Sequence, residues 1–304
     1  MSKKVVIQVD HLHKVYGSFT AVEDISLEID EGEIFGIIGP NGAGKTTTTE
    51  CLEGLRQPDG GTLRVLGLDP QRQGDELRQR IGVQLQQAVL PDKLKVWEAL
   101  DLFSTFYRRS VDWRPLLEQW GLAEKRNTMF AGLSGGQKQR LFIALALVND
   151  PEVVFLDELT TGLDPQARRE TWEHVQAIRQ RGKTVLLVTH FMDEAERLCD
   201  RIAIIDHGRV VAIDTPQNLI RRVQAEARVR FSADGLKPES LQAVSGVSRV
   251  VRDGNDMVVY GTGPLMAHVA AALAERGVTP PDLRAEQPTL EDVFLALTGR
   301  QLRD

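Results

Sequence analysis

The sequence predicts an α/β fold built around a phosphate-binding loop, and three observations support that prediction. Residues 39–46 fit G-x-x-x-x-G-K-[ST], the pattern of loops that wrap phosphates. The loop follows a short apolar run at residues 34–38, which suits a buried strand, and precedes residues 46–55, which contain no proline and can form a helix. Further short strands are predicted around this unit, for example at residues 25–29, where apolar and polar residues alternate.

The loop has the residue types that phosphate binding requires. Glycines allow the backbone to approach an anion closely, and backbone N–H groups at the start of the following helix point toward it. Lys45 would reach the β- and γ-phosphates, and the Thr46 hydroxyl would hold Mg²⁺. An incidental glycine-rich turn is the alternative, but the strand before and the helix after argue against it. The expected nucleotide contacts are Gly39, Asn41, Gly42, Gly44, Lys45, Thr46 and Thr47.

Composition narrows the class of protein. At 304 residues, with 42% hydrophobic and 26% charged residues, the chain suits a soluble globular protein of two domains. The net charge of −6 argues against nucleic acid as the main partner. Cys51 and Cys199 lack metal-ligand spacing and are expected to be ordinary thiols of a reducing compartment. We find no signal peptide and no run of about 18 apolar residues, so a membrane role would need a partner chain.

The N-terminal strand carries two histidines and a tyrosine. His11 and His13 could suggest a metal site, but no third ligand is near in sequence, so we expect a surface strand. Tyr16 follows at the end of this strand, upstream of the phosphate loop. It could stack on adenine or could be a core tyrosine, and residue type alone does not decide between the two.

A helical insert is predicted after the first strands. Its apolar residues fall at helical intervals; they are Val96, Ala99, Leu100, Phe103 and Tyr107. A second helix is expected over residues 116–120, ending at Gly121.

Two acidic residues close a later apolar run. Residues 153–156 are apolar and are followed by Asp157 and Glu158. A buried strand that ends in an aspartate can place that carboxylate beside the Mg²⁺ held by Thr46. Glu158 would then be placed to orient or deprotonate the attacking water.

A third motif, at residues 134–137, has two interpretations. Ser134 and Gln137 form an S-x-x-Q capping box that opens a helix. Gly135 and Gly136 are poor helix formers, and they make more sense if the backbone there contacts another group. A helix N-terminus with bare N–H groups suits a phosphate, and this one would serve a different nucleotide from that of residues 39–46.

At these motifs the chain resembles the ATP-binding subunits of ATP-binding cassette (ABC) transporters, over about residues 3–220. Leu133-Ser134-Gly135-Gly136-Gln137 matches that family's signature letter for letter. The resemblance implies a P-loop NTPase ABC cassette with a mixed sheet core. It also implies a nucleotide-binding domain at residues 1–220, a helical subdomain at about residues 86–150, and ATP with Mg²⁺ as cofactors.

The resemblance also assigns roles to single residues. Tyr16 would be the adenine-stacking aromatic. Gln86 would join the Mg²⁺ site to the helical insert as a catalytic and metal-binding residue, although Gln84 and Gln87 leave this position open.

Residues 161–164 look like the loop that crosses to the partner cassette, which places Asp164 near the nucleotide. His190 looks like the switch histidine that contacts the γ-phosphate. Leu159 departs from the family, where many members have proline; this changes backbone stiffness beside Glu158 but leaves both carboxylates in place.

One phosphate loop and one signature per chain imply a head-to-tail pair of cassettes, either a homodimer or a pairing with a similar cassette. ATP would join the two, and hydrolysis would release them. A membrane-spanning permease subunit is the second expected partner, with the cassette at the cytoplasmic face of the cell membrane. Residues 88–94 either contact that permease or pack under the helical insert.

The C-terminal part, residues 221–304, is expected to be a small α/β domain. Strands are predicted at residues 228–231 and 257–260, and a helix at residues 265–276, closed by Gly277.

The last helix is expected to begin at Thr289 and to carry one apolar stripe. The stripe consists of Leu290, Val293, Phe294 and Leu297. This end resembles the tails of exporter ATPases for drugs, lipids and polysaccharides, such as the daunorubicin-resistance type, where such tails accompany dimerisation or regulation.

Two alternatives compete with an exporter ATPase. A soluble ABC ATPase acting on ribosomes or DNA usually has two cassettes or a long coiled-coil insert, and the sequence has neither. A regulator without turnover would lack the catalytic base, but Glu158 and His190 are present.

Overall fold

The computed structural model describes residues 4–84, 89–222, 226–233 and 236–299. The chain divides after Pro216 into two compact units, Met1–Pro216 and Gln217–Gln301. Each unit has its own sheet and is described separately.

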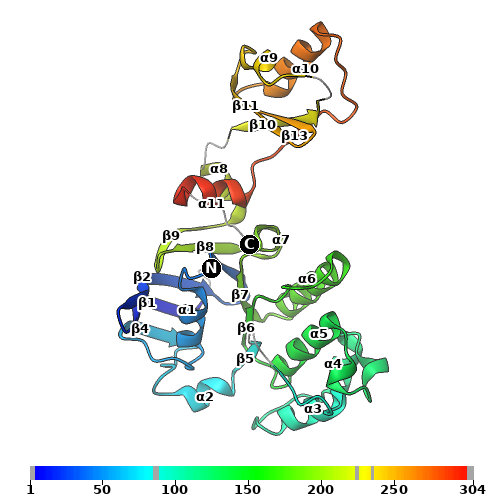
Figure 1. Cartoon of the computed structure of the whole chain (residues 1–304). Helices are drawn as coiled ribbons and strands as arrows, with labels where there is room; N and C mark the ends of the chain where they lie inside the picture. Colours follow the sequence, from blue (N-terminus) through cyan, green and yellow to red (C-terminus); the bar gives the residue numbers. More distant parts are fainter. Residues whose placement is uncertain (1–3, 85–88, 223–225, 234–235, 300–304) are drawn as a thin grey trace. The chain divides into compact units, whose positions relative to one another are not determined.

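The first unit is built on a nine-stranded sheet (Figure 1). Its strands are β1 (Val5–Tyr16), β2 (Phe19–Asp30), β3 (Ile34–Ile38), β4 (Gly60–Val65), β5 (Ile81–Gln84), β6 (Val153–Asp157), β7 (Thr184–Thr189), β8 (Arg201–Asp206) and β9 (Arg209–Asp214). They lie in the order β4-β1-β2-β9-β8-β3-β7-β6-β5. Strands β8, β3, β7, β6 and β5 are parallel, whereas β1 pairs antiparallel with β2 and β4. The predicted mixed sheet is confirmed.

Burial follows the residue pattern of each strand. All residues of β3 and β7 are buried, as expected of central parallel strands with helices on both faces. In β2 the buried residues Ile25, Leu27 and Ile29 alternate with residues that are exposed or less buried, as predicted for a half-buried strand.

Besides two short 3-10 helices (Ala123–Lys125 and Phe130–Gly132), the first unit contains seven α-helices among the described residues. They are α1 (Lys45–Leu52), α2 (Gly74–Arg78), α3 (Val96–Ser104), α4 (Arg114–Gln119), α5 (Gly135–Ala146), α6 (Pro165–Gln180) and α7 (Met192–Leu198). Helices α3, α4 and α5 lie within residues 86–150, where the helical insert is expected, and α5 contacts β5 (Figure 1). Helix α3 ends at Ser104, so Tyr107 lies outside it, contrary to the prediction; Gly121, with φ +60°, follows α4 as predicted.

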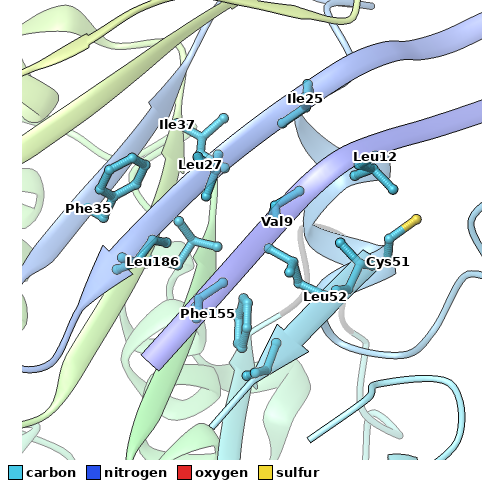
Figure 2. Packing of buried hydrophobic residues seen from close by; sticks show 14 of the residues in the cluster. Val9, Leu12, Ile25, Leu27, Phe35, Ile37, Cys51, Leu52, Phe155 and Leu186 are labelled. Carbon is cyan, nitrogen blue, oxygen red and sulfur yellow. The ribbon is translucent and has the colours of Figure 1, made fainter. Parts of the chain in front are cut away.

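Helix α1 is held in the core of the first unit. Cys51 and Leu52 of α1 pack in one cluster with Val9 and Leu27 of the antiparallel strands and Phe155 of β6 (Figure 2). The start of α1 is therefore fixed relative to both parts of the sheet. Burial also raises the pKa of the Cys51 thiol to about 11, so this cysteine is an unreactive core residue.

The second unit is a four-stranded antiparallel sheet with helices. The strands are β10 (Ala227–Ser232), β11 (Val247–Asp253), β12 (Asp256–Gly261) and β13 (Arg284–Glu286), in the order β11-β12-β10-β13. The helices are α8 (Pro216–Arg222), α9 (Glu239–Gln242), α10 (Leu265–Glu275) and α11 (Leu290–Thr298). The predicted strands at residues 228–231 and 257–260 and the helix at residues 265–276 are confirmed.

Helix α11 differs from its prediction in one residue. Thr289 and Asp292 form a capping box, and Leu290, Val293 and Phe294 are buried. Leu297 is 42% exposed, because it lies in the last turn before Gly299 ends the helix, where the buried stripe has already stopped.

Two further predictions concern membranes and metals. No helix in the described ranges combines the length and the apolar character needed to span a membrane. His11 lies on the surface and contacts Asp24, and the same ranges contain no cluster of three His, Cys, Asp or Glu side chains suited to a metal ion. The predicted strand is β1, on which His11 is exposed and His13 is half-buried.

We expect Leu186→Ala to lower the free energy of unfolding by about 2–5 kcal/mol, because it leaves a cavity among fully buried residues of β7. Val211→Ala, at a 39% exposed position, is the matched control. All four tryptophans (Trp97, Trp113, Trp120 and Trp172) lie in the first unit, so their fluorescence during urea unfolding reports on it. Equal urea midpoints for the two variants would contradict the assigned core.

Candidate nucleotide-binding site

The sheet brings three chain segments to one edge. Strand β7 lies between β3 and β6, with Ile38 opposite Thr189 and Asp157 opposite Val188. Since the three strands are parallel and end together, the phosphate loop, Glu158 and His190 all follow carboxyl ends of strands at the same edge. Ligands of open α/β sheets bind at this edge.

The phosphate loop is shaped by close backbone contacts. Gly44 has φ +102°, and a Cβ atom there would lie 2.5 Å from the Ala21 carbonyl oxygen. A Cβ atom on Gly39 would lie 2.2 Å from the Ile205 carbonyl oxygen. Both positions therefore require glycine if the loop is to keep this path.

Lys45 occupies the centre of the loop. Its ammonium group donates to the carbonyl oxygens of Gly39 (2.8 Å) and Pro40 (3.0 Å), and the residue is only 6% exposed. Burial lowers the pKa of Lys45, while the nearby carboxylates of Glu158 and Asp157 oppose that change. An entering phosphate can replace the two carbonyl oxygens and give the buried cation a stronger, charged partner.

A cavity of about 230 Å³ lies over the loop. Its lining residues are Tyr16, Phe19, Ala21, Asn41, Gly42, Gly44, Lys45, Thr46, Thr47 and Glu158. The expected nucleotide contacts in this part of the chain thus surround one space, with Gly39 just behind it as a partner of Lys45.

Tyr16 lies at the rim of this cavity and is not a core tyrosine. It is 38% exposed, and the cationic groups of Lys14 and Arg56 lie 5.4 and 5.2 Å from its ring centroid. Phe19, which the sequence analysis missed, pairs with Tyr16 across the β1–β2 hairpin and is 58% exposed. The available signal was a second aromatic residue directly after the Gly17 turn.

The residues expected to hold Mg²⁺ fit that ion. The Thr46 hydroxyl lies 3.5 Å from Asp157 Oδ2, and Asp157 Oδ1 is buried without a hydrogen-bond partner among the described residues. Burial, followed by the charge of Glu158, raises the pKa of Asp157 to about 6. A hard cation ligated by the hydroxyl and the carboxylate would satisfy the orphaned oxygen and offset that burial.

Glu158 and His190 face each other at the same edge. Glu158 Oε1 lies 3.3 Å from His190 Nδ1, and the Glu158 backbone N–H donates to Val188 O (2.9 Å). Glu158 has φ +48°, a left-handed conformation that costs a non-glycine residue about 1 kcal/mol or more. Leu159, in place of the family's proline, is fully buried, and both acidic side chains remain at the edge.

The signature residues lie elsewhere, and none of them lines the cavity over Lys45. Ser134 caps α5: its hydroxyl accepts from the Gln137 N–H (3.3 Å), and Gln137 Oε1 accepts from the Ser134 N–H (3.0 Å), which confirms the capping box. Ser134 and Gly135 are exposed, and a Cβ atom on Gly135 would meet nothing within 4 Å, whereas Gly136 faces Ala167. The helix start is open on one side.

Asp164 also lies outside the cavity lining. Asp164 caps α6 by accepting from the N–H groups of Gln166 and Ala167, each over 3.0 Å. Gln86 and the alternative Gln87 fall outside the described residues, whereas Gln84 is a buried residue at the end of β5.

We expect Asp157→Asn to weaken ATP binding in Mg²⁺ by about tenfold or more, because it removes the charged ligand but keeps the side-chain shape. Binding of a fluorescent ATP analogue is measured with Mg²⁺ and with EDTA. Asp10→Asn, at an exposed position on β1, is the control. If the ratio of the affinity in Mg²⁺ to the affinity in EDTA were the same in Asp157→Asn as in wild type, the assignment of Asp157 would be contradicted.

Comparison with known proteins agrees with this geometry. A family model described as ABC transporter matches residues 22–161. "Nod factor export ATP-binding protein I" of Sinorhizobium fredii is 40% identical and covers 99% of this chain and 88% of its own length. The protein of the same name from Paraburkholderia xenovorans is 40% identical and covers 99% of both chains. These relatives carry the Nod factor export name, not a daunorubicin-resistance name.

Solved structures show the same fold. An ATP-binding subunit of an ABC transporter aligns with a TM-score of 0.65 at 31% identity, covering 71% of this chain and 92% of its own. A cassette solved as a dimer in a post-hydrolysis state, bound to ADP and Pi, aligns with a TM-score of 0.61 at 28% identity, covering 69% and 98%. The chain therefore belongs to the ABC transporter family and is an ATP-binding, ATP-hydrolysing subunit of it.

Proposed function

We propose that this protein is the energising subunit of an ABC exporter and drives transport through a separate membrane subunit. The proposal rests on the separation of the phosphate-loop site from the signature motif within one chain. The loop, Asp157, Glu158 and His190 meet at one sheet edge, while the open helix start at Ser134 lies apart from that cavity. Such a chain would supply the phosphate loop of one nucleotide site and the signature motif of a second site.

Hydrolysis at the sheet edge would use the chain's own groups in distinct roles. Lys45 exchanges its carbonyl partners for the β- and γ-phosphate oxygens, and Tyr16 stacks on the adenine. Thr46 and Asp157 would hold Mg²⁺, which would neutralise part of the phosphate charge when bound. Glu158 orients the attacking water and accepts its proton, and His190 holds Glu158 and contacts the γ-phosphate. Gln86 would link the Mg²⁺ site to the helical insert.

The second half of the site would come from another cassette. Exposed N–H groups at the start of α5, with its helix dipole, suit a γ-phosphate presented by a facing loop. Asp164 lies at the start of α6, close to the signature helix, since a Cβ atom on Gly136 would lie 3.5 Å from the Ala167 Cβ atom. A similar cassette solved as a dimer supports the pairing of two cassettes. Loss of the γ-phosphate on hydrolysis would release the pair.

Export is supported by the names of the relatives, which cover nearly the whole chain. The transmembrane path would belong to a permease subunit, with the cassette bound at the cytoplasmic face of the membrane. In the loop expected to contact that subunit, Val89 is 81% exposed while Leu90 is 8% exposed. Val89 is therefore the better contact candidate, and Leu90 packs inside the unit.

The alternatives are less well supported. A soluble ABC ATPase acting on ribosomes or DNA does not match the export names of the relatives, and a regulator without turnover does not need the Glu158–His190 pair. The second unit remains a proposed dimerisation or regulatory domain.

We expect Glu158→Gln to trap an ATP-bound dimer, because it keeps nucleotide binding but removes the base. Gel filtration with saturating Mg-ATP measures the dimer. Lys45→Ala is the paired variant and should abolish ATP turnover and give no trapped dimer. A Glu158→Gln protein that stays monomeric in saturating Mg-ATP would count against the proposed mechanism.

A further inference from the structure

Glu194 is a buried carboxyl group that lies outside the lining of the nucleotide cavity. It belongs to the first turn of α7 and is 0% exposed. The indole N–H of Trp172, on α6, donates to Glu194 Oε1 over 3.0 Å, and Trp172 is itself buried. Each of these polar groups needs the other once water is excluded. One buried hydrogen bond therefore joins α6 to α7.

The start of α7 is tied to His190. Phe191 directly precedes the first turn of this helix, and its backbone N–H donates to Thr189 Oγ1 (3.0 Å) at the end of β7. The rings of His190 and Phe191 pack together with their centroids 4.1 Å apart. The position of α7 therefore affects where His190 Nδ1 meets Glu158 Oε1, which lies 3.3 Å away.

A second contact from α6 reaches the same end of α7. Arg168 Nη1 lies 3.3 Å from Asp193 Oδ2, and the Arg168 guanidinium lies 4.8 Å from the centroid of the Phe191 ring. Arg168 and Trp172 are four residues apart and so share one face of α6. The same helix begins at Asp164, which caps it. Helix α6 thus connects the residue expected at the facing cassette with the start of α7.

Glu194 also lies close to the turn that follows Glu158. Thr160, in this turn, is 1% exposed. Burial raises the pKa of Glu194, whereas the side chains of Thr189, Trp172 and Thr160 favour its charged form and oppose that change. Thr160 Oγ1 and Glu194 Oε2 are both buried without a hydrogen bond to any described residue. A small shift of the turn would bring these two atoms into hydrogen-bond geometry.

Fold stability alone does not explain this carboxyl group. A buried oxygen without a hydrogen bond is costly, and an apolar side chain of similar size, such as leucine, would avoid that cost. The segments that meet at Glu194 are α6, the end of β7 and the turn after Glu158. These segments carry the catalytic pair and the expected contact with the facing cassette.

We propose that Glu194 is a positioning residue for ATP hydrolysis. Through its hydrogen bond with Trp172 it holds His190 in place relative to the start of α6, and its second oxygen would accept from Thr160 when the turn shifts. The inference rests on the roles proposed for His190 and Asp164. A facing cassette that moves the start of α6 would act on this hydrogen bond and, through α7, on His190.

The test is ATP hydrolysis by the full-length chain with single substitutions. Trp172→Phe keeps a ring and removes the N–H group, Glu194→Leu removes the carboxyl group, and Glu194→Gln keeps Oε1 as an acceptor. We expect the first two to lower kcat about tenfold with KM for ATP within about twofold of wild type, because they misplace His190 and leave nucleotide binding intact. Glu194→Gln should keep at least about half of the wild-type kcat. Trp97→Phe, at a half-buried position on α3, is the control and should not change kcat.

Histidine ring resonances provide a readout that a general loss of stability would not move. The chain is labelled with ¹³C-histidine, and the His190 peak is assigned by its absence in His190→Ala. We expect this peak to shift in Trp172→Phe and in Glu194→Leu. The peaks of His11 on β1 and His268 on α10 should stay in place.

The outcomes separate this inference from the proposed function. Wild-type kcat in both Trp172→Phe and Glu194→Leu, or a His190 peak that shifts in neither, overturns the positioning role. A Glu194→Gln protein as slow as Glu194→Leu also overturns it. If His190→Ala hydrolyses ATP at the wild-type rate, the proposed role of His190 fails together with the inference. If His190→Ala is inactive while Glu194→Leu is fully active, only the positioning role fails.

Discussion

The pairing of three parallel strands is the constraint on which the site depends. Strand β7 aligns β3 on one side and β6 on the other, and the registers fix where each strand ends. A shift of one residue in this pairing would turn every side chain of the shifted strand to the opposite face. Buried apolar side chains such as Phe155 and Leu186 resist that shift (Figure 2). The core thus fixes the positions of the phosphate loop, the carboxylates and the histidine.

Charge distribution explains why the site suits ATP with a divalent cation. Among the described residues, the Lys45 ammonium group is hydrogen-bonded only to carbonyl oxygens of its own loop, and Asp157 Oδ1 has no hydrogen-bond partner. Burial raises the pKa of Asp157 to about 6. Both groups gain by binding, the lysine from a polyanion and the aspartate from a cation.

Sequence patterns predicted the local features well. The phosphate loop, the capping box at Ser134 and the acidic pair at Asp157 and Glu158 each depend on neighbouring residues, so their geometry is encoded within a few positions. The mixed sheet followed from short apolar runs, and the helical insert followed from residue spacing. Helix ends were predicted less well, as Tyr107 shows, because the chain leaves α3 at Ser104.

Features formed by distant segments escaped the sequence analysis. Phe19 joins the nucleotide cavity only through its pairing with Tyr16 across the hairpin. A cavity of about 580 Å³ is built from residues just after α1, from α2 and β5, and from residues after α3, and no single stretch of sequence shows that these meet. Leu297 fits a helical stripe by spacing, yet burial depends on what covers each turn, which spacing does not report.

The central claim is that two cassettes complete each other's sites, and mixing two inactive variants tests it most directly. Ser134→Arg removes the cap of the signature helix and blocks its open start. Lys45→Ala removes the cationic side chain of the phosphate loop. In a head-to-tail pair, a heterodimer of the two retains one site with an intact loop and an intact signature. We predict that an equal mixture hydrolyses ATP at about a quarter of the wild-type rate, since half of the dimers are mixed and each has one intact site. A mixture no more active than the separate variants would contradict the account.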